Sequence, residues 1–169
     1  MANTQAMCTS FLGQLLTGKH NFGVGTIRAA TTADTFNAAL FLASATLNAS
    51  TTAYTGTVGS VAMTGEVSGT NYTAGGIPVT NATAPTSTNS SATAGVGYWT
   101  PSASLVYTTV TLTTAFDTVL IFNVTQGSAG NYPAVSVHTF SSQTITAGTL
   151  TLTMPSNTTT TALLRLATT

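Results

Sequence analysis

Charged side chains are scarce in this chain of 169 residues, which has three Lys or Arg, three Asp or Glu and no net charge. A soluble domain normally carries about 25% charged residues, whereas here the fraction is 4%. Nucleic-acid binding through a basic surface needs several cations to neutralise phosphates. The three cations, Lys19, Arg28 and Arg165, are spread along the whole chain. We therefore expect no nucleic-acid partner.

Long apolar runs and paired cysteines are missing as well. A membrane span needs about 20 mostly apolar residues, and the densest runs here, at 38–43 and 119–122, have the length of a strand. The first residues do not combine a cationic region with an apolar stretch, so we expect synthesis in the cytoplasm without a cleaved leader. The single cysteine, Cys8, excludes an intramolecular disulfide. We expect no membrane partner.

The titratable side chains do not form a recognisable catalytic or metal-binding pattern. They include Asp34, Glu66, Asp117, His20, His138 and Cys8. The three carboxylates are isolated in sequence, and we expect each to pair with a cation or to lie at a turn. His138 alternates with Val135 and Val137, which predicts a polar strand face, and Cys8 is expected to be buried and inert. The sequence therefore predicts no enzyme, no catalytic residue, no metal and no cofactor.

One helix is expected, at residues 4–18. Met7, Phe11 and Leu15 recur at a spacing of four residues, with Cys8, Leu12 and Leu16 beside them, which is the pattern of an amphipathic helix. Thr4 can cap its start and Gly18 can end it. The other face carries Gln, Thr and Ser without charge, so it suits contact with another protein as well as with water.

The rest of the chain, from about residue 36 to 169, has a β character. The chain contains 40 threonines, and β-branched residues favour strands. Alternation or continuous apolar runs predict about eight short strands. The expected segments are 36–42, 58–63, 66–72, 106–113, 118–124, 135–138, 149–154 and 162–166.

Two regions between these segments carry turn and loop signals. Residues 73–78 contain Gly75-Gly76 and Pro78, which predict a turn or bulge. Residues 81–97 are rich in Ser, Thr, Asn and Ala and predict a long projecting loop. Without repeats or linkers, residues 1–169 form one expected domain. The expected fold is mainly β (α+β), an antiparallel β-sandwich or jelly roll with one N-terminal helix.

The positive signal in the composition is a bias toward assembly. A surface of Thr, Ser, Asn and Ala offers hydrogen bonds without the cost of desolvating ions, and a net charge of zero removes electrostatic repulsion between copies. Tyr98 and Trp99 are either an aromatic anchor in an interface or a plug in the core. With Phe11 and Leu15 of the expected helix, they are the candidate interface residues.

Several segments together carry a family resemblance. They are residues 8–11, 15–22, 34–36, 39–40, 44–47, 51–54, 65–76, 148–155 and 162–166. Over nearly its whole length the chain resembles small virion-associated proteins of tailed bacteriophages. None of these motifs is catalytic. The resemblance implies a structural virion protein.

Within that class, the resemblance favours a capsid decoration or cement protein on the capsid surface. Such proteins are small, β-rich and present in many copies, and they fasten the capsid lattice against internal pressure. The implied partners are the major capsid protein and further copies of this chain, with a trimer as one arrangement. The alternative is a small tail, neck or fibre-associated protein with a receptor- or glycan-binding role.

Overall fold

The computed structural model describes residues 3–8, 11, 15, 19–20, 22, 33–80, 84–88 and 95–167. These residues are mainly β. The strands are β1 (Ala6–Met7), β2 (Phe36–Leu42), β3 (Ala53–Tyr54), β4 (Ile77–Pro78), β5 (Thr86–Ser87), β6 (Val96–Trp99), β7 (Leu105–Asn123), β8 (Tyr132–Leu152) and β9 (Leu164–Ala167). Within these ranges no helix is long and apolar enough to cross a membrane.

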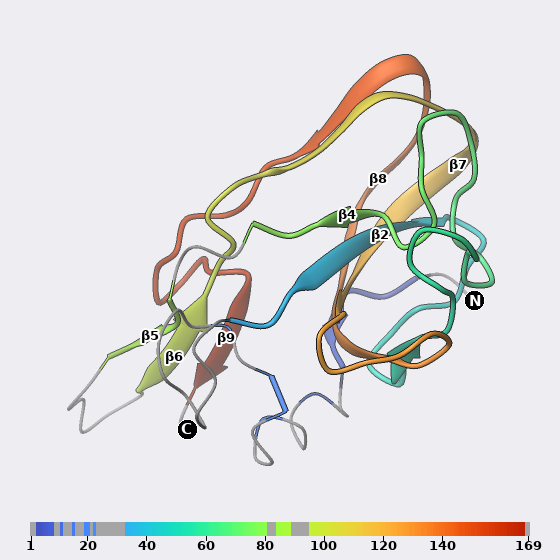
Figure 1. Cartoon of the computed structure of the whole chain (residues 1–169). Helices are drawn as coiled ribbons and strands as arrows, with labels where there is room; N and C mark the ends of the chain where they lie inside the picture. Colours follow the sequence, from blue (N-terminus) through green and yellow to red (C-terminus); the bar gives the residue numbers. More distant parts are fainter. Residues whose placement is uncertain are drawn as a thin grey trace.

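The strands form two antiparallel sheets (Figure 1). The large sheet has the order β1-β8-β7-β2-β4, and β3 also pairs with β8. The small sheet has the order β5-β6-β9. The mainly β class with antiparallel pairing, expected from the sequence, is therefore confirmed.

The centre of the large sheet is made by the two continuous apolar runs. β2 pairs with the second half of β7 from Phe36 opposite Asn123 to Leu42 opposite Phe116. Phe36 to Phe41 are all buried, as are residues 118–123. A strand buried on both faces has no need of alternation, and the expectation for these two runs is confirmed.

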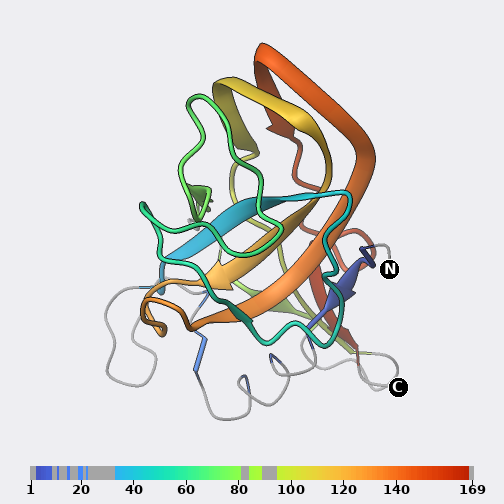
Figure 2. The same ribbon diagram turned by 90° about the vertical axis from the view of Figure 1, so that its right-hand side faces the viewer.

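A single long hairpin replaces four of the expected short strands. The segments 106–113 and 118–124 largely join into β7, and 135–138 and the first part of 149–154 join into β8, which ends at Leu152. Repeated register shifts along the pair act as bulges, and the hairpin bends over the sheet (Figures 1 and 2). Thr109 and Ala147 adopt left-handed φ values of 53° and 47° in this region. The bend brings the Tyr107 hydroxyl to within 2.7 Å of the Ala38 carbonyl, to which it donates.

The expected helix at 4–18 is not shown. Its first part is wrong, because Ala6–Met7 forms β1, which pairs with Val137 and Ser136 of β8. The Cys8 amide continues this contact by donating to the Val135 carbonyl at 3.1 Å. A short helix is only marginally stable alone, whereas the edge of β8 offers ready backbone partners. Of the remainder, Phe11 and Leu15 are helical, as expected, and residues 9–10, 12–14 and 16–18 lie outside the described ranges.

Three other segments differ from the expected ones. Residues 58–63 and 66–72 form no strand and are turns joined by isolated bridges, such as Thr70 with Thr111. The expected loop at 81–97 contains β5 and the start of β6, which pair with each other, while 81–83 and 89–94 lie outside the described residues. The turn at 73–78 is confirmed, since Gly75 and Gly76 have φ values of 84° and 65°.

A buried carboxylate holds these turns against β2. Glu66 is 7% exposed. Its Oε2 accepts hydrogen bonds from the Tyr54 hydroxyl at 2.7 Å and the Met63 amide at 2.8 Å. Its Oε1 accepts from the Tyr72 hydroxyl at 2.8 Å and the Gly75 amide at 2.7 Å. Four donors from four positions thus converge on one side chain. The Glu66 amide also donates to the Met63 carbonyl, which closes a turn at this point.

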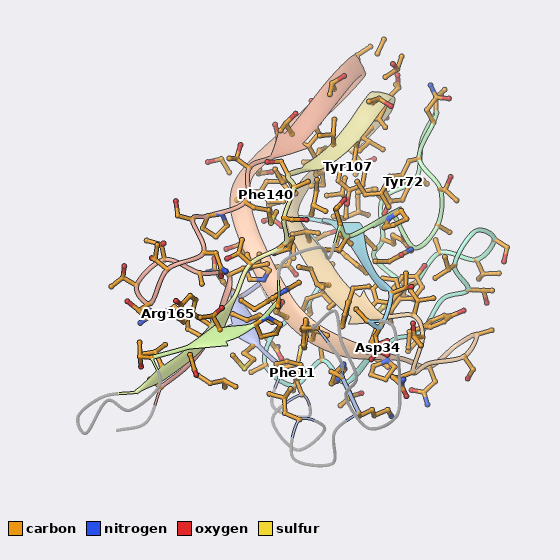
Figure 3. All side chains as sticks on the ribbon, turned by 60° about the vertical axis from the view of Figure 1, so that its left-hand side comes forward. Phe11, Asp34, Tyr72, Tyr107, Phe140 and Arg165 are labelled. Atoms are coloured by element: carbon orange, nitrogen blue, oxygen red, sulfur yellow. The ribbon has the colours of Figure 1, made fainter. Side chains whose placement is uncertain are left out.

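The tyrosines around Glu66 extend this network into β2 and the bent hairpin. The Tyr72 hydroxyl accepts a hydrogen bond from the Leu40 amide at 2.9 Å. The rings of Tyr72 and Tyr107 stack with centroids 6.1 Å apart (Figure 3). Burial, together with the nearby Glu66 charge, raises the pKa of Tyr54, Tyr72 and Tyr107 well above the ordinary range. All three hydroxyls therefore stay protonated and can donate.

Removal of the Glu66 carboxylate should loosen this part of the fold. We expect Glu66→Ala to lower the free energy of unfolding by about 3 kcal/mol, because it leaves several buried donors without an acceptor. Tyr72→Phe, which removes one donor to Glu66 and also the acceptor of the Leu40 amide, should cost about 2 kcal/mol. Urea denaturation of the variants measures both. A Glu66→Ala protein as stable as the parent would contradict the assigned role.

Candidate protein-binding groove

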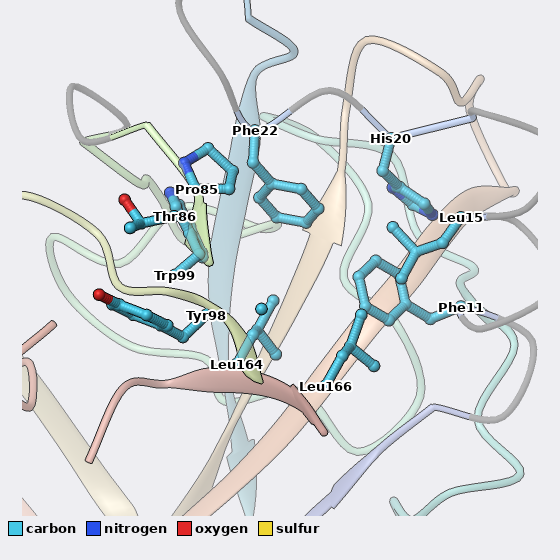
Figure 4. Close-up of a pocket in the computed structure, with 11 residues that line it drawn as sticks. Phe11, Leu15, His20, Phe22, Pro85, Thr86, Tyr98, Trp99, Leu164 and Leu166 are labelled. Atoms are coloured by element: carbon cyan, nitrogen blue, oxygen red, sulfur yellow. The ribbon is translucent and has the colours of Figure 1, made fainter. Parts of the chain in front are cut away.

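An apolar groove lies between the N-terminal residues and the small sheet (Figure 4). Its volume is about 260 Å³. The lining residues are Phe11, Leu15, His20, Phe22, Pro85, Thr86, Gly97, Tyr98, Trp99, Leu164 and Leu166. The structure therefore brings together all four candidate interface residues, Phe11, Leu15, Tyr98 and Trp99, in one place.

The four candidates have different positions in this groove. Trp99 is 3% exposed and Phe11 is 2% exposed, so both belong to the core beneath it. Tyr98 and Leu15 are half-buried and can be reached from outside. The geometry thus agrees with the core role that the sequence left open for Trp99. Tyr98 remains accessible as a contact residue.

Packed aromatic rings form the floor of the groove. Phe22 stacks on Phe36 of β2 with centroids 4.5 Å apart and lies 4.7 Å from Trp99. Phe11 meets His20 edge to face at 4.9 Å. Such ring pairs add specific geometry to apolar burial. The floor is therefore continuous with the core of the large sheet and gives the groove a fixed shape.

A buried polar network lies behind this floor. The Asn123 Nδ2 group lies 3.0 Å from His20 Nδ1 and donates to Asp34 Oδ2 at 2.8 Å. Gln126 Nε2 donates to Asp34 Oδ1 at 3.1 Å, and the Gln126 amide donates to Asn123 Oδ1 at 3.0 Å. Asn123 is fully buried. The network fixes the loop after β7 to the segment before β2, and so holds His20 in the groove wall.

The last strand supplies the opposite wall. β9 pairs with β6 so that Leu164 lies opposite Trp99 and Arg165 opposite Tyr98. Leu164 is buried, whereas Leu166 is 43% exposed at the rim. Sequence reasoning left Phe22, His20, Leu164 and Leu166 out of the candidate interface. The alternation of Leu164 and Leu166 around Arg165 was the one available signal that both leucines share a face.

The remaining titratable groups lie in other surroundings. Burial raises the pKa of the Cys8 thiol to about 11, which agrees with an inert thiol. Asp117 Oδ1 accepts hydrogen bonds from Asn3 Nδ2 at 2.8 Å and from the Thr118 hydroxyl at 2.6 Å. Within the described ranges, no three His, Cys, Asp or Glu side chains gather in a group that could hold a metal.

His138 lies in a more enclosed place than an outward polar face. Its Nε2 lies 2.9 Å from the Ser136 hydroxyl. It lines two cavities that also contact Leu163, in the segment that leads to β9. Burial lowers the pKa of His138 to about 4. His138 thus lies on the same face of β8 as Ser136 and is half-buried there, beside the C-terminal segment.

Comparisons with protein-family models, curated proteins and solved structures found no match to this chain.

Alanine variants of Trp99 and Tyr98 should distinguish a core residue from a contact residue by their effect on stability. We expect Trp99→Ala to lower the free energy of unfolding by about 3–5 kcal/mol, as for other large-to-small changes in a core. Tyr98→Ala should cost about 1 kcal/mol or less, because its ring is only half-buried. Urea denaturation monitored by far-UV circular dichroism compares the two. Similar losses for both variants would show that Tyr98 is also a core residue.

His138 should make the stability depend on pH. Its folded pKa of about 4 lies below the ordinary value of about 6.5, so the unfolded chain takes up the proton first as the pH falls. Stability should therefore decline from pH 7 to pH 4, by up to about 3 kcal/mol from this group. In His138→Gln that contribution should be absent. Parallel pH dependences for the parent and the variant would contradict the burial of the ring.

Proposed function

We propose that this chain is a structural virion protein of a tailed bacteriophage, and most specifically a capsid decoration protein. Its two antiparallel sheets form a sandwich-like body in this proposal, and its apolar groove receives a charge-poor segment of the major capsid protein. Tyr98, Leu15 and Leu166 contact that segment at the rim. Phe11 and Trp99 support them from below.

The groove is the observation that carries the proposal. It is concave and apolar and has a floor fixed by packed rings. Burial of such a surface is favourable in proportion to the apolar area removed from water. Arg165 is the charged residue of the adjoining wall, and it is exposed on β9. A partner segment therefore loses little through desolvation of ions when it binds.

The lining favours a protein segment over a sugar. Glycan recognition needs several polar groups aimed at the hydroxyls of the sugar, and small-molecule sites generally place such groups within the pocket. Here the lining is mostly Phe, Leu, Trp, Pro and Gly. This supports a lattice contact more than the receptor- or glycan-binding alternative.

The copy number in purified particles tests the proposed function. Quantitative mass spectrometry against the major capsid protein should find hundreds of copies, since a decoration protein occupies repeated lattice sites. About a dozen copies would place the chain in the tail or neck. Its absence from particles would refute a virion role.

Two exposed apolar residues provide a matched test of the groove. Leu166 at the rim is 43% exposed, and Val61 in a distant turn is 58% exposed. Leu166→Asp should lower binding to undecorated particles at least about tenfold, because it places a charge in an apolar contact. Val61→Asp should bind like the parent. Equal binding by the two variants in a co-sedimentation assay would show that the groove is not the capsid contact.

A further inference from the structure

One edge of the large sheet is covered along only half of its length. On the side of β8 away from β7, β1 pairs with residues 136–137 and β3 pairs with residues 132–133. Beyond them, from Thr139 to Thr149, nothing in the described part of the chain outside the hairpin hydrogen-bonds to the β8 backbone. This half of β8 forms the outer rim of the hairpin in Figures 1 and 2.

The fold covers the outward edges of β7 and β2. On the outer half of β7, the Thr111 amide donates to the Thr70 carbonyl at 3.1 Å, and Asn71 Nδ2 donates to the Thr109 carbonyl at 2.9 Å. On β2, the Leu42 amide donates to the Gly65 carbonyl at 2.9 Å, and Ala38 pairs with Ile77 of β4. The open half of β8 is the exception among these edges.

This open edge lacks the usual protection against strand pairing. Natural proteins protect long edges with Lys, Pro or inward-pointing charges, and residues 139–149 contain no charged residue and no proline. Register shifts next to Gln143 and Gly148 bend β8 but do not cover it. The stretch 139–146 is still longer than an average strand of about five or six residues.

The side chains of this stretch suit a second copy of the same strand. Ser141, Ser142, Thr144 and Thr146 are exposed. A hydroxyl both donates and accepts hydrogen bonds, so these side chains match their own kind across a strand pair. Two identical strands without charge do not repel each other.

We propose that residues 139–146 of β8 pair antiparallel with the same residues of a second copy, related by a twofold axis. The pairing satisfies the outward backbone groups of β8 and extends the large sheet across two chains. A contact of this kind uses the same patch on both copies and closes after two, so it forms a dimer. The inference goes beyond the proposed function and names the surface for the self-association that the uncharged composition favours.

Charge placed on the edge tests this surface. In sedimentation velocity of the full chain, the parent should form a dimer at micromolar concentrations. Thr144→Lys/Thr146→Lys should weaken it at least about tenfold, because lysines on a strand edge oppose pairing and the contact would then hold four positive charges without a counter-charge. The matched control, Thr113→Lys/Thr114→Lys, changes exposed threonines on β7 of the same hairpin and should dimerise like the parent. A monomeric parent, a trimer, or equal effects of the two variants would overturn the proposal.

Cross-linking locates the axis directly. Cα atoms of paired residues in an antiparallel sheet lie about 4.5–5.5 Å apart, within the range of a disulfide. Of the single variants Ser142→Cys, Gln143→Cys and Thr144→Cys, the one nearest the axis should form a disulfide-linked dimer under mild oxidation. Thr113→Cys should not, and the buried Cys8 should not interfere. No linked dimer from any of the three β8 variants would contradict the pairing.

The two proposals fail in different ways. A dimer linked through β8 that is absent from particles would refute the virion role and leave the edge pairing intact. If the chain occurs in hundreds of copies per particle but is monomeric in solution and is not linked by these cysteines, the edge pairing is refuted and the virion role stands.

Discussion

The Glu66 carboxylate is the contact on which the arrangement of the loops over the sheet depends. The segment between β3 and β4 contains turns and isolated bridges but no strand ladder. Two of its backbone amides and the Tyr72 hydroxyl, together with the Tyr54 hydroxyl of β3, are instead directed to one buried acid. Because Tyr72 also contacts the Leu40 amide and stacks on Tyr107, the same acid links β2 to the outer half of β7. A chain with three carboxylates thus uses one of them as an internal anchor.

The register shifts along the long hairpin bend its outer half over β2, next to that anchor, and leave one of its edges open. Tyr107 reaches the Ala38 carbonyl only because the outer half of β7 folds back over β2. Thr109 and Ala147 hold left-handed backbone conformations near the bend, which are costly for residues with a Cβ and persist where the surrounding contacts demand them. As β7 turns inward over the sheet, β8 remains on the outside. The uncovered half of β8 is therefore a consequence of the core packing.

Sequence reasoning identified the parts of this fold that are set by local patterns. The continuous runs of β2 and of the second half of β7, and the turn at Gly75-Gly76, depend on burial and on backbone freedom, which the residues display directly. The sequence pattern did not predict that the short segments join into the long strands β7 and β8. Polar threonines separate the apolar runs, and bulges have no clear sequence signature. The four-residue spacing of Met7, Phe11 and Leu15 wrongly predicted that the helix includes residues 6–7. These two residues instead pair with the edge of β8 as a strand. Glu66 could not be placed, because its tyrosine partners meet it only through tertiary contacts.

The scarcity of charge gives the groove and the β8 edge a common property. The groove offers apolar burial and the edge offers backbone and hydroxyl hydrogen bonds, so neither surface depends on an ion pair. Salt screens interactions between exposed charges, so it should change the strength of such contacts little. The two surfaces also belong to different parts of the fold, the small sheet and the outer half of the hairpin. The proposed capsid contact at the groove and the proposed pairing through β8 are therefore compatible on one chain.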